Sequence, residues 1–351
     1  MNPRIQKLTD SFKEYNIDAF LVTKDINIRY LTLFPARESW LLVSPKGNFY
    51  ITDFRYIQEA KEGLKGVKIH PYTKSIYSAA VDLARRLNIK KIGFDSRHLN
   101  VFQYENLKKA GASDLKFIKT NQLVEQLREI KDEDEIRKIR QALKIHQEAL
   151  QFLKKVIKPG ISEKDVLQRL EEFVRERGVE FSFPPIIASG PNSCYPHAKV
   201  TGRRIRFNEL VLVDTGIDVD GYKSDLTRIF FLGKIPQLIE RAYTYVREAQ
   251  QEAIQKIRAG IAAAYVDQAA RNYLKMRRLD KFFGHALGHG VGLEIHESPR
   301  LSQNDPAILK EGMVVTIEPA VYIPRQFGIR IEDMVLVKKK NCEVLSGNID
   351  H

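Results

Sequence analysis

Val211-Leu-Val-Asp-Thr-Gly-Ile-Asp-Val-Asp-Gly-Tyr-Lys-Ser-Asp-Leu-Thr-Arg-Ile-Phe-Phe231 is the stretch that decides the fold of the second half of this chain. Its two apolar arms flank a turn at residues 218–221, and this pattern predicts a β-hairpin. One acid lies on each arm, Asp214 on the first and Asp225 on the second. Because side chains alternate with a period of two, a loop of even length places both acids on the same face of the hairpin.

A second predicted hairpin follows the same plan closer to the C-terminus. Residues 314–318 and 329–337 read as its arms, and residues 324–328 read as its turn. A loop of odd length brings Glu318 and Glu332 to one face. Two such hairpins facing each other would frame an interior with four acids, although the period of two does not show that they meet.

The sequence predicts two domains, which we place at residues 1–125 and 126–351. The first domain alternates strands and helices, which predicts an α/β fold with a mixed sheet. Its expected elements are a helix over 4–16, strands over 18–23 and 91–95, a hairpin over 40–52 and a helix over 78–87.

The second domain is expected to be α+β, because four predicted helices interleave with hairpins instead of alternating with single strands. These helices cover residues 133–157, 162–178, 236–260 and 264–278, and the hairpins cover 205–232 and 313–338. Ser162 and Asp165 have the spacing of a capping box at the start of the second helix.

Composition excludes several classes of protein. No run of 18 apolar residues exists, and the N-terminus lacks the apolar stretch of a secretion signal, so we expect no membrane partner. Two cysteines are too few for a disulfide framework, which favours a cytoplasmic location. The net charge of +13 is spread along the chain and mixed with acids, so we expect solvated faces and no nucleic-acid partner.

The acids of the two hairpins indicate a metal site. Paired acids repel each other, and buried pairs must either shift their pKa values or bind a cation. His289 stands between glycines in Gly284-His-Ala-Leu-Gly-His-Gly-Val-Gly-Leu-Glu-Ile-His-Glu297, where the backbone can approach closely. Four carboxylates and one imidazole suit two divalent ions with a shared water, which is equipment for hydrolysis. The alternative is that the acids are solvated strand positions.

With these motifs the chain resembles the pita-bread fold metallopeptidases of the aminopeptidase P and prolidase branch. Ile28-Arg-Tyr-Leu-Thr-Leu-Phe34 resembles the Arg-Tyr-Leu-Thr-Gly-Phe motif of the creatinase-type N-terminal domain found in that branch. The resemblance covers nearly the whole chain. It implies a pita-bread (creatinase/aminopeptidase-like) second domain, a proline-containing peptide as substrate, and a homodimer that forms through the N-terminal domains.

The resemblance also implies a role for each site residue. Asp214 matches a ligand of one metal, Asp225 and Glu332 match the bridging carboxylates, and His289 and Glu318 match ligands of the other metal. Manganese is the expected ion, with cobalt or zinc as alternatives. Four residues are expected to act on the substrate, with Glu318 also as the proton shuttle: His197, His296, Glu318 and Arg330.

Departures from the family pattern leave the side-chain preference open. Val200 stands where members often have proline, and Cys194-Tyr195 replaces smaller residues. An Xaa-Pro dipeptidase and an Xaa-Pro aminopeptidase are both compatible with the sequence, and Arg300 slightly favours the dipeptidase as a candidate carboxylate binder. A methionine aminopeptidase-like enzyme, a metal-free creatinase and a non-catalytic scaffold relative are the remaining alternatives, and the complete ligand set argues against the last two.

Overall fold

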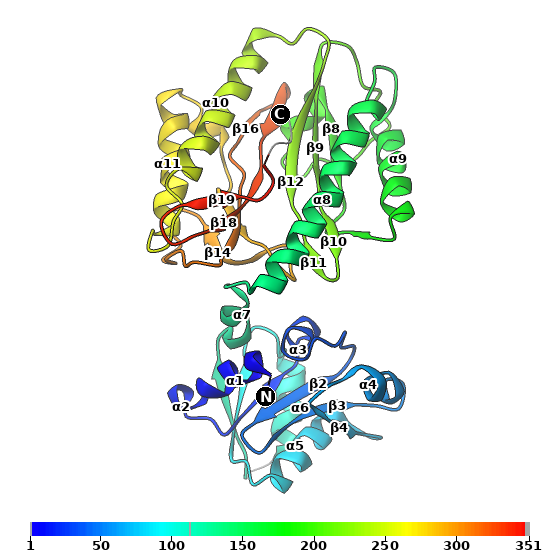
Figure 1. Ribbon diagram of the computed structural model, residues 1–351, viewed down its shortest axis with the longest axis vertical. Coiled ribbons are helices and arrows are strands. Elements are labelled where there is room, and N and C mark those ends of the chain that lie inside the picture. Colours follow the sequence, from blue (N-terminus) through cyan, green and yellow to red (C-terminus); the bar gives the residue numbers. More distant parts are fainter. Residues whose placement is uncertain (1, 112–113, 348–351) are drawn as a thin grey trace. The chain divides into compact units, whose positions relative to one another are not determined.

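The computed structural model describes residues 2–111 and 114–347 and divides into two compact units (Figure 1). Unit 1 comprises Met1–Arg128, and unit 2 comprises Glu129–His351. The boundary placed between residues 125 and 126 from the sequence falls inside α7 (Leu123–Arg128), the last helix of unit 1. None of the helices in the described ranges is long and apolar enough to span a bilayer.

Unit 1 is built on a six-stranded sheet in the order β4-β3-β2-β1-β5-β6. The strands are β1 (Ala19–Val22), β2 (Trp40–Ser44), β3 (Gly47–Thr52), β4 (Lys68–Pro71), β5 (Lys91–Asp95) and β6 (Lys116–Thr120). β1, β2 and β3 pair antiparallel, whereas β3–β4, β1–β5 and β5–β6 pair parallel. The predicted mixed sheet is therefore confirmed.

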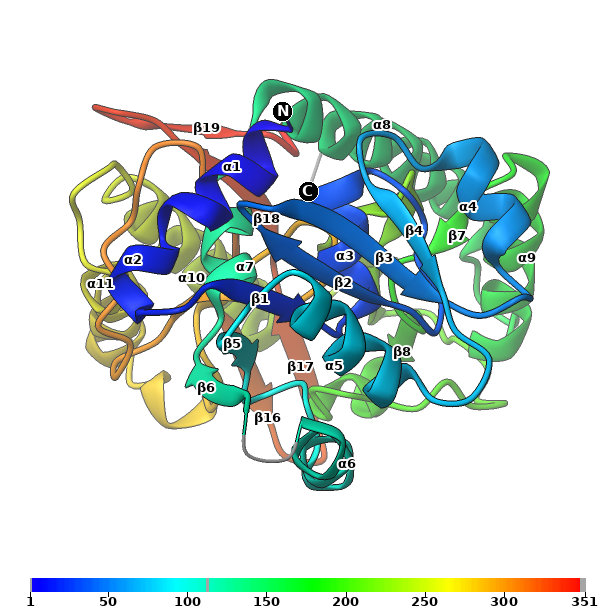
Figure 2. The same cartoon turned by 90° about the horizontal axis from the view of Figure 1, so that it is seen from below.

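Helices cover this sheet on both sides, as Figures 1 and 2 show. They are α1 (Pro3–Asp10), α2 (Phe12–Tyr15), α3 (Asp25–Thr32), α4 (Ile57–Gly63), α5 (Ile76–Arg86), α6 (Val101–Gly111) and α7. Ala80, Ala84 and Leu107 of α5 and α6 pack against Leu21 and Leu42 of the sheet in one apolar cluster. The prediction of a single helix over residues 4–16 is wrong in one detail, because the helix is interrupted at Ser11 and forms two helices, α1 and α2.

Unit 2 has helices on both sides of its strands (Figure 1). The helices are α8 (Glu133–Val156), α9 (Glu163–Glu176), α10 (Gln237–Ile254) and α11 (Ala263–Met276), with two 3-10 helices, η1 (Gly190–Cys194) and η2 (Asp280–Phe282). The predicted capping box of α9 is present, with Ser162 and Asp165 bonded reciprocally. The prediction that α10 extends to Gly260 is wrong, because the helix ends at Ile254 and a turn follows.

The strands in the described part of unit 2 form four sheets. They are β7 (Glu180–Phe181), β8 (Ile186–Ser189), β9 (Glu209–Thr215), β10 (Ile217–Val219), β11 (Tyr222–Lys223), β12 (Leu226–Leu232), β13 (Gly288–Gly290), β14 (Glu297–Leu301), β15 (Val314–Ile317), β16 (Ala320–Ile323), β17 (Phe327–Arg330), β18 (Asp333–Val337) and β19 (Cys342–Val344). Their orders are β11-β10-β7, β12-β9-β8, β14-β13-β15-β18-β19 and β16-β17. Helices and hairpins interleave along the chain, so the α+β arrangement of unit 2 is confirmed.

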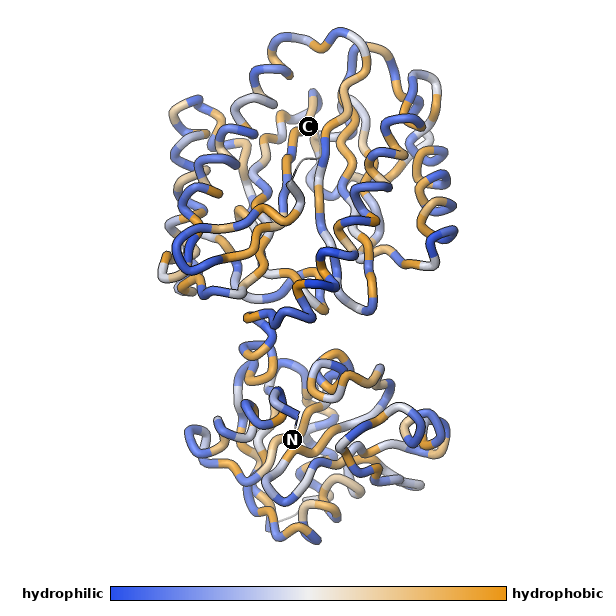
Figure 3. Tube along the Cα trace, viewed as in Figure 1, coloured by the Kyte–Doolittle hydropathy of each residue, from blue (hydrophilic) through white to orange (hydrophobic). Residues whose placement is uncertain are grey.

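The two faces of β9 are buried against different halves of unit 2. Val211 and Val213 pack with α8 and α9, whereas Leu210 and Leu212 pack with α10, α11 and the strands of the second half. The strands are mainly hydrophobic in Figure 3, as this burial on both sides requires. Because side chains alternate, Asp214 lies on the same face as Leu210 and Leu212 and points toward the second half of the unit.

Candidate metal centre

The first hairpin places its two acids on one face. β9 and β12 pair antiparallel, with Thr227 opposite Asp214 and Leu226 opposite Thr215. Asp225 directly precedes β12, two residues before Thr227, and therefore shares the face of Asp214. Both carboxyl groups are buried, with 8% of Asp214 and 4% of Asp225 exposed.

The second hairpin is interrupted at the position of its two acids. β15 pairs with β18 and β16 with β17, and both ladders keep one register, in which Ile317 faces Asp333 and Ala320 faces Arg330. Glu318 and Glu332 lie in the gap between the ladders. The gap follows from Pro319, which has no N–H to donate, while the Glu318 N–H bonds to Leu287 O at 2.7 Å.

His289 lies on β13, where the neighbouring strands leave no space for a Cβ on either side of it. A Cβ at Gly288 would lie 1.9 Å from the Thr316 carbonyl oxygen, and one at Gly290 would lie 2.3 Å from the Ser298 carbonyl oxygen. The ring Nδ1 of His289 lies 3.1 Å from the Gly290 carbonyl oxygen, which accepts a hydrogen bond from Nδ1–H and leaves Nε2 as the free ligand atom.

Nε2 of His289 faces acids from both hairpins. It lies 3.6 Å from Asp225 Oδ2 and 3.5 Å from Glu318 Oε1. One ligand atom each from Asp225, His289 and Glu332 lie within 4.8 Å of one another. The structure therefore brings together acids and an imidazole that are separated by up to 107 residues in the sequence (332 − 225).

The raised pKa values of these acids indicate that the site is incomplete without cations. Burial raises the pKa of Asp225 and of Glu318 well above the ordinary values, and repulsion from Glu332 adds to both shifts. Burial, together with the charge of Asp214, raises the pKa of Glu332 to about 8. Burial lowers the pKa of His289 to about 4, so its imidazole is neutral and able to bind a metal.

An unsatisfied oxygen provides a second test of the fit. Asp214 Oδ1 is buried and has no hydrogen-bond partner among the described residues. A buried carboxylate oxygen without a donor is costly, whereas a divalent cation would satisfy it. The donor set, oxygen-rich with one imidazole nitrogen, thus fits hard divalent ions.

Arg330 is the centre of a hydrogen-bond network beside these acids. Its guanidinium donates to Asp214 Oδ2 and to the Tyr322 hydroxyl in short contacts, to Thr227 Oγ1 at 3.0 Å and to the Pro196 carbonyl oxygen at 3.2 Å. Thr227 Oγ1 in turn donates to Glu332 Oε2 at 2.8 Å. Thr227 and Tyr322 were not predicted as site residues. Each nevertheless lies an even number of residues after a predicted acid, Thr227 after Asp225 and Tyr322 after Glu318.

Three further histidines surround this group. His197 follows η1 in an exposed loop, and the Pro196 carbonyl oxygen directly before it accepts from Arg330 Nη1 at 3.2 Å. The rings of His289 and His296 meet edge to face with centroids 4.4 Å apart. His285, which had no predicted role, lies with Nε2 3.3 Å from the Tyr322 hydroxyl and Nδ1 4.0 Å from Glu318 Oε2.

Arg300 lies on β14 directly opposite His289 of β13. Directly opposed residues of an antiparallel pair project from the same face, so Arg300 shares the face of His289. Arg300 is exposed, and its positive charge acts to lower the pKa values of His289, His296 and Glu318.

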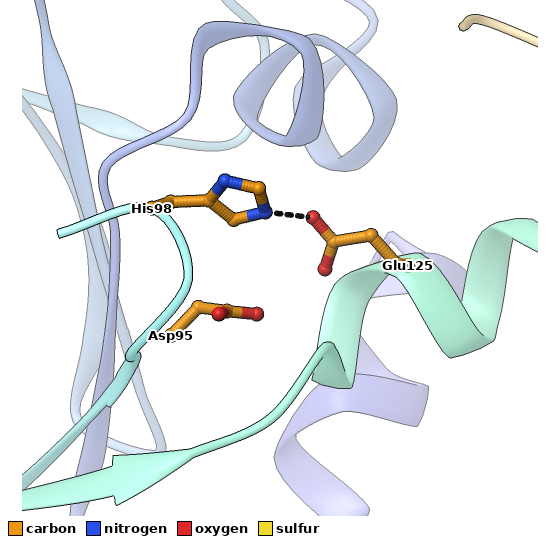
Figure 4. A group of neighbouring side chains, drawn as sticks. All are labelled: Asp95, His98 and Glu125. Atoms are coloured by element: carbon orange, nitrogen blue, oxygen red, sulfur yellow. Dashed lines mark hydrogen bonds and ion pairs between the residues drawn. The ribbon is translucent and has the colours of Figure 1, made fainter. Parts of the chain in front are cut away.

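A second group with metal-ligand geometry lies in unit 1 and has a structural explanation. Asp95, His98 and Glu125 offer ligand atoms within 4.8 Å of one another (Figure 4). However, both oxygens of Asp95 accept backbone N–H groups, from Arg97 at 2.8 Å and Gln122 at 2.7 Å. His98 Nε2 lies 2.6 Å from Glu125 Oε1, so this group fastens α7 to the loop after β5.

Comparison with known proteins agrees with this geometry. Residues 137–339 match the model of metallopeptidase family M24, and residues 4–130 match the creatinase/prolidase N-terminal domain. The chain belongs to metallopeptidase family M24. The chain is therefore a metallopeptidase, and the pita-bread fold expected of unit 2 is confirmed.

Individual M24 relatives match over almost the whole chain. An Xaa-Pro dipeptidase of Pyrococcus horikoshii is 34% identical over 349 residues, which are 99% of this chain and 97% of the relative. A solved structure of an Xaa-Pro dipeptidase from Bacillus anthracis is 35% identical, with a TM-score of 0.95, and covers 99% of this chain and 98% of its own. An X-Pro aminopeptidase structure from Thermotoga maritima is 32% identical, with a TM-score of 0.88, and covers 96% and 97%.

Proposed function

We propose that this protein hydrolyses the peptide bond between an N-terminal residue and a following proline, using two divalent metal ions. The observation that carries the proposal is that Asp225, His289 and Glu332 offer ligand atoms within 4.8 Å of one another. Glu318 Oε1 lies 3.5 Å from His289 Nε2, and Asp214 shares the hairpin face of Asp225. The names of the dipeptidase and aminopeptidase relatives, which share the full length of the chain, support the substrate class.

We assign Asp214 to one metal, Asp225 and Glu332 to both, and His289 with Glu318 to the other. The proximity of His289 Nε2 to Asp225 and Glu318 supports this division. Manganese is the proposed ion because the donors are mostly carboxylate oxygens, and cobalt and zinc are the alternatives. When bound, such a pair of ions lowers the pKa of a water and supplies the nucleophile at neutral pH.

The remaining roles belong to side chains of this chain. Glu318 is half-buried, and its carboxylate would take a proton from the attacking water and deliver it to the departing proline nitrogen. His197 and His296 would donate hydrogen bonds to the oxyanion, a contribution of about 3–4 kcal/mol for one donor in other enzymes. Arg330 holds Asp214 in place through its buried ion pair.

Proline after the scissile bond suits this site for a chemical reason. The peptide nitrogen of an Xaa-Pro bond has no N–H, so the site needs no acceptor for one. The proline ring also fixes its own backbone torsion, which lowers the entropy lost on binding.

We further propose that the enzyme prefers dipeptides. The free carboxylate of an Xaa-Pro dipeptide needs a cation, and Arg300 shares the face of the strand that carries His289. An aminopeptidase acting on longer peptides has no such carboxylate next to the scissile bond. Arg300 is therefore the residue on which the distinction depends.

The assay that tests the function compares hydrolysis of Ala-Pro and Ala-Pro-Ala in manganese buffer. We expect faster cleavage of Ala-Pro, and we expect Arg300→Gln to raise KM for Ala-Pro while leaving that for Ala-Pro-Ala almost unchanged. Faster cleavage of Ala-Pro-Ala would make the enzyme an aminopeptidase. Cleavage of neither peptide by the manganese-loaded protein would refute the proposed function.

We also propose a cytoplasmic homodimer that forms through unit 1. Leu33, Phe54, Val101 and Phe102 support this assembly, because these large apolar side chains of unit 1 are 68–82% exposed. The two cysteines, Cys194 and Cys342, are both free, as expected in a reducing compartment. Light scattering after size-exclusion chromatography would give the mass of a monomer if the assembly is wrong.

A further inference from the structure

Glu163, the first residue of α9, is a buried carboxylate with no role in the proposed reaction. The residue has 0% of its surface exposed. Its two oxygens accept hydrogen bonds from five donors, which fill the roughly four lone-pair sites of a carboxylate completely. These donors are Ser189 N at 2.7 Å, Ser189 Oγ at 2.8 Å, Asn192 Nδ2 at 2.9 Å, Thr201 N at 3.0 Å and Thr201 Oγ1 at 2.7 Å.

The donors lie on both sides of His197. Ser189 and Asn192 precede the histidine, and Thr201 follows it by four residues, so the Glu163 carboxylate closes the loop at its base. Asn192 Nδ2 also donates to the Lys199 carbonyl oxygen at 3.1 Å, which ties the two sides of the loop together a second time.

The start of α9 supports the same loop through its backbone. The N–H of Glu163 donates to Arg203 O at 3.0 Å, and that of Lys164 donates to Thr201 O at 3.1 Å. Arg203 completes the assembly, because its guanidinium donates to Ser189 Oγ at 2.6 Å and binds both oxygens of Glu209 at 2.7 and 2.6 Å. The ends of the loop are thus fixed to a helix and to β9.

The tip of the loop reaches the candidate metal centre. The carbonyl oxygen of Pro196, directly before His197, accepts from Arg330 Nη1 at 3.2 Å. His197 itself is exposed. The position of this imidazole therefore depends on how the loop is anchored at its base, and Glu163 is the group that joins both sides of that base.

We propose that Glu163 is a positioning residue for His197, acting through the loop of residues 189–203. This inference rests on the proposed function, in which His197 donates to the oxyanion. An oxyanion donor contributes only when it is held in the right geometry before the reaction. Loss of the Glu163 anchor would displace His197 while leaving the five metal-binding side chains, none of which lies in this loop, in place.

Glu163→Gln is the informative substitution, because it keeps the shape of the side chain and replaces one acceptor oxygen by an NH2 group. Either orientation of the amide points donors at Ser189 or at Thr201, both of which are donors themselves. Asp165→Asn is the matched control: Asp165 is another carboxylate in the first turn of α9, and its hydrogen bonds in the described structure are to Ser162.

We expect Glu163→Gln to lower kcat for Ala-Pro roughly 10-fold or more with unchanged manganese content, since small displacements of catalytic groups have effects of this size. Asp165→Asn should stay within about 2-fold of wild type, as a surface cap of one helix. The decisive measurement is the double variant: in a His197→Ala background, Glu163→Gln should change kcat less than about 2-fold, because the group it positions is gone.

Three results would overturn the inference. They are wild-type kcat in Glu163→Gln, a loss of bound manganese equal to the loss of activity, or the same fold reduction with and without His197. If Glu163→Gln does not fold by circular dichroism, the same comparison with Asn192→Ala, which removes one of the donors, decides the question. An inactive manganese-loaded wild type would instead refute the proposed function, so the two failures are distinguishable.

Discussion

Arg330 and Asp214 lie 116 residues apart in the sequence and form a buried ion pair between β17 and β9. The Arg330 side chain is 5% exposed, and that of Asp214 is 12% exposed. Arg330 thus compensates the charge of an acid that burial would otherwise favour in its neutral form, and it joins the two hairpins at the candidate metal centre.

Arg330→Met should lower kcat/KM for Ala-Pro by about 10²-fold or more, since a buried acid loses its partner beside the reacting groups. Arg330→Lys should recover only part of this loss. Lysine restores the charge but not the planar fork that contacts Asp214, Tyr322 and Thr227 together. Steady-state kinetics measure this difference. A kcat/KM of Arg330→Lys equal to that of wild type would contradict this account.

Asp225→Asn should abolish hydrolysis and leave the fold intact. Asp225 is the buried acid that faces His289 Nε2 and shares a face with Asp214, so its loss removes a ligand proposed to serve both ions. Metal analysis should find less bound manganese, while the metal-free variant should be at least as stable as wild type because repulsion among buried acids is relieved. Activity above about a tenth of wild type would contradict the assignment.

His197→Ala should impair turnover more than metal binding. The imidazole lies in the loop after η1 and is proposed as a donor to the oxyanion, whose loss costs about 10²-fold or more in kcat. Manganese content measured by mass spectrometry should remain that of wild type. A large loss of metal in this variant would make His197 a ligand instead.

His146 should make a contribution to the stability of unit 2 that is lost progressively below pH 6.5. This residue of α8 is fully buried beside Ser224, and burial, with a smaller effect of the Arg228 charge, lowers its pKa to about 3. Between pH 6.5 and about pH 3, His146 binds a proton in the unfolded chain but not in the folded chain. Its contribution to the free energy of unfolding therefore falls by up to roughly 1.4 kcal/mol per pH unit.

Calorimetry of the metal-free protein at pH 7, 6 and 5 measures this dependence. It suits unit 2 better than tryptophan fluorescence, because the single tryptophan, Trp40, lies in unit 1. The free energy of unfolding of wild type minus that of His146→Gln should fall as the pH is lowered from 7 to 5, because the contributions of the other buried groups are common to both proteins. If the free energies of unfolding of the two proteins changed in parallel with pH, His146 would not contribute to the pH dependence of stability.

Sequence reasoning succeeded where the physics is local. The alternation of side chains placed Asp214 and Asp225 on one face, and the observed register, with Thr227 opposite Asp214, agrees. The capping pair Ser162 and Asp165 located the start of α9 for the same reason, since both interactions act within one turn of helix.

The features that were missed depend on contacts between distant segments. The gap in the second hairpin arises because Glu318 bonds to Leu287, which no period within the hairpin reveals. Tyr322 and Thr227 belong to the site through Arg330, which contacts both from a distant segment. The donors around Glu163 come from three segments, so the sequence shows only an unremarkable acid in the first turn of a helix.

The most direct test of the account is an anomalous-scattering measurement at the manganese absorption edge on crystals of the manganese-loaded protein. The account predicts two peaks, with Asp225 and Glu332 contacting both ions and His289 contacting one of them. The five proposed ligands are Asp214, Asp225, His289, Glu318 and Glu332. Absence of manganese from these ligands, or a single ion held elsewhere in the chain, would contradict the account.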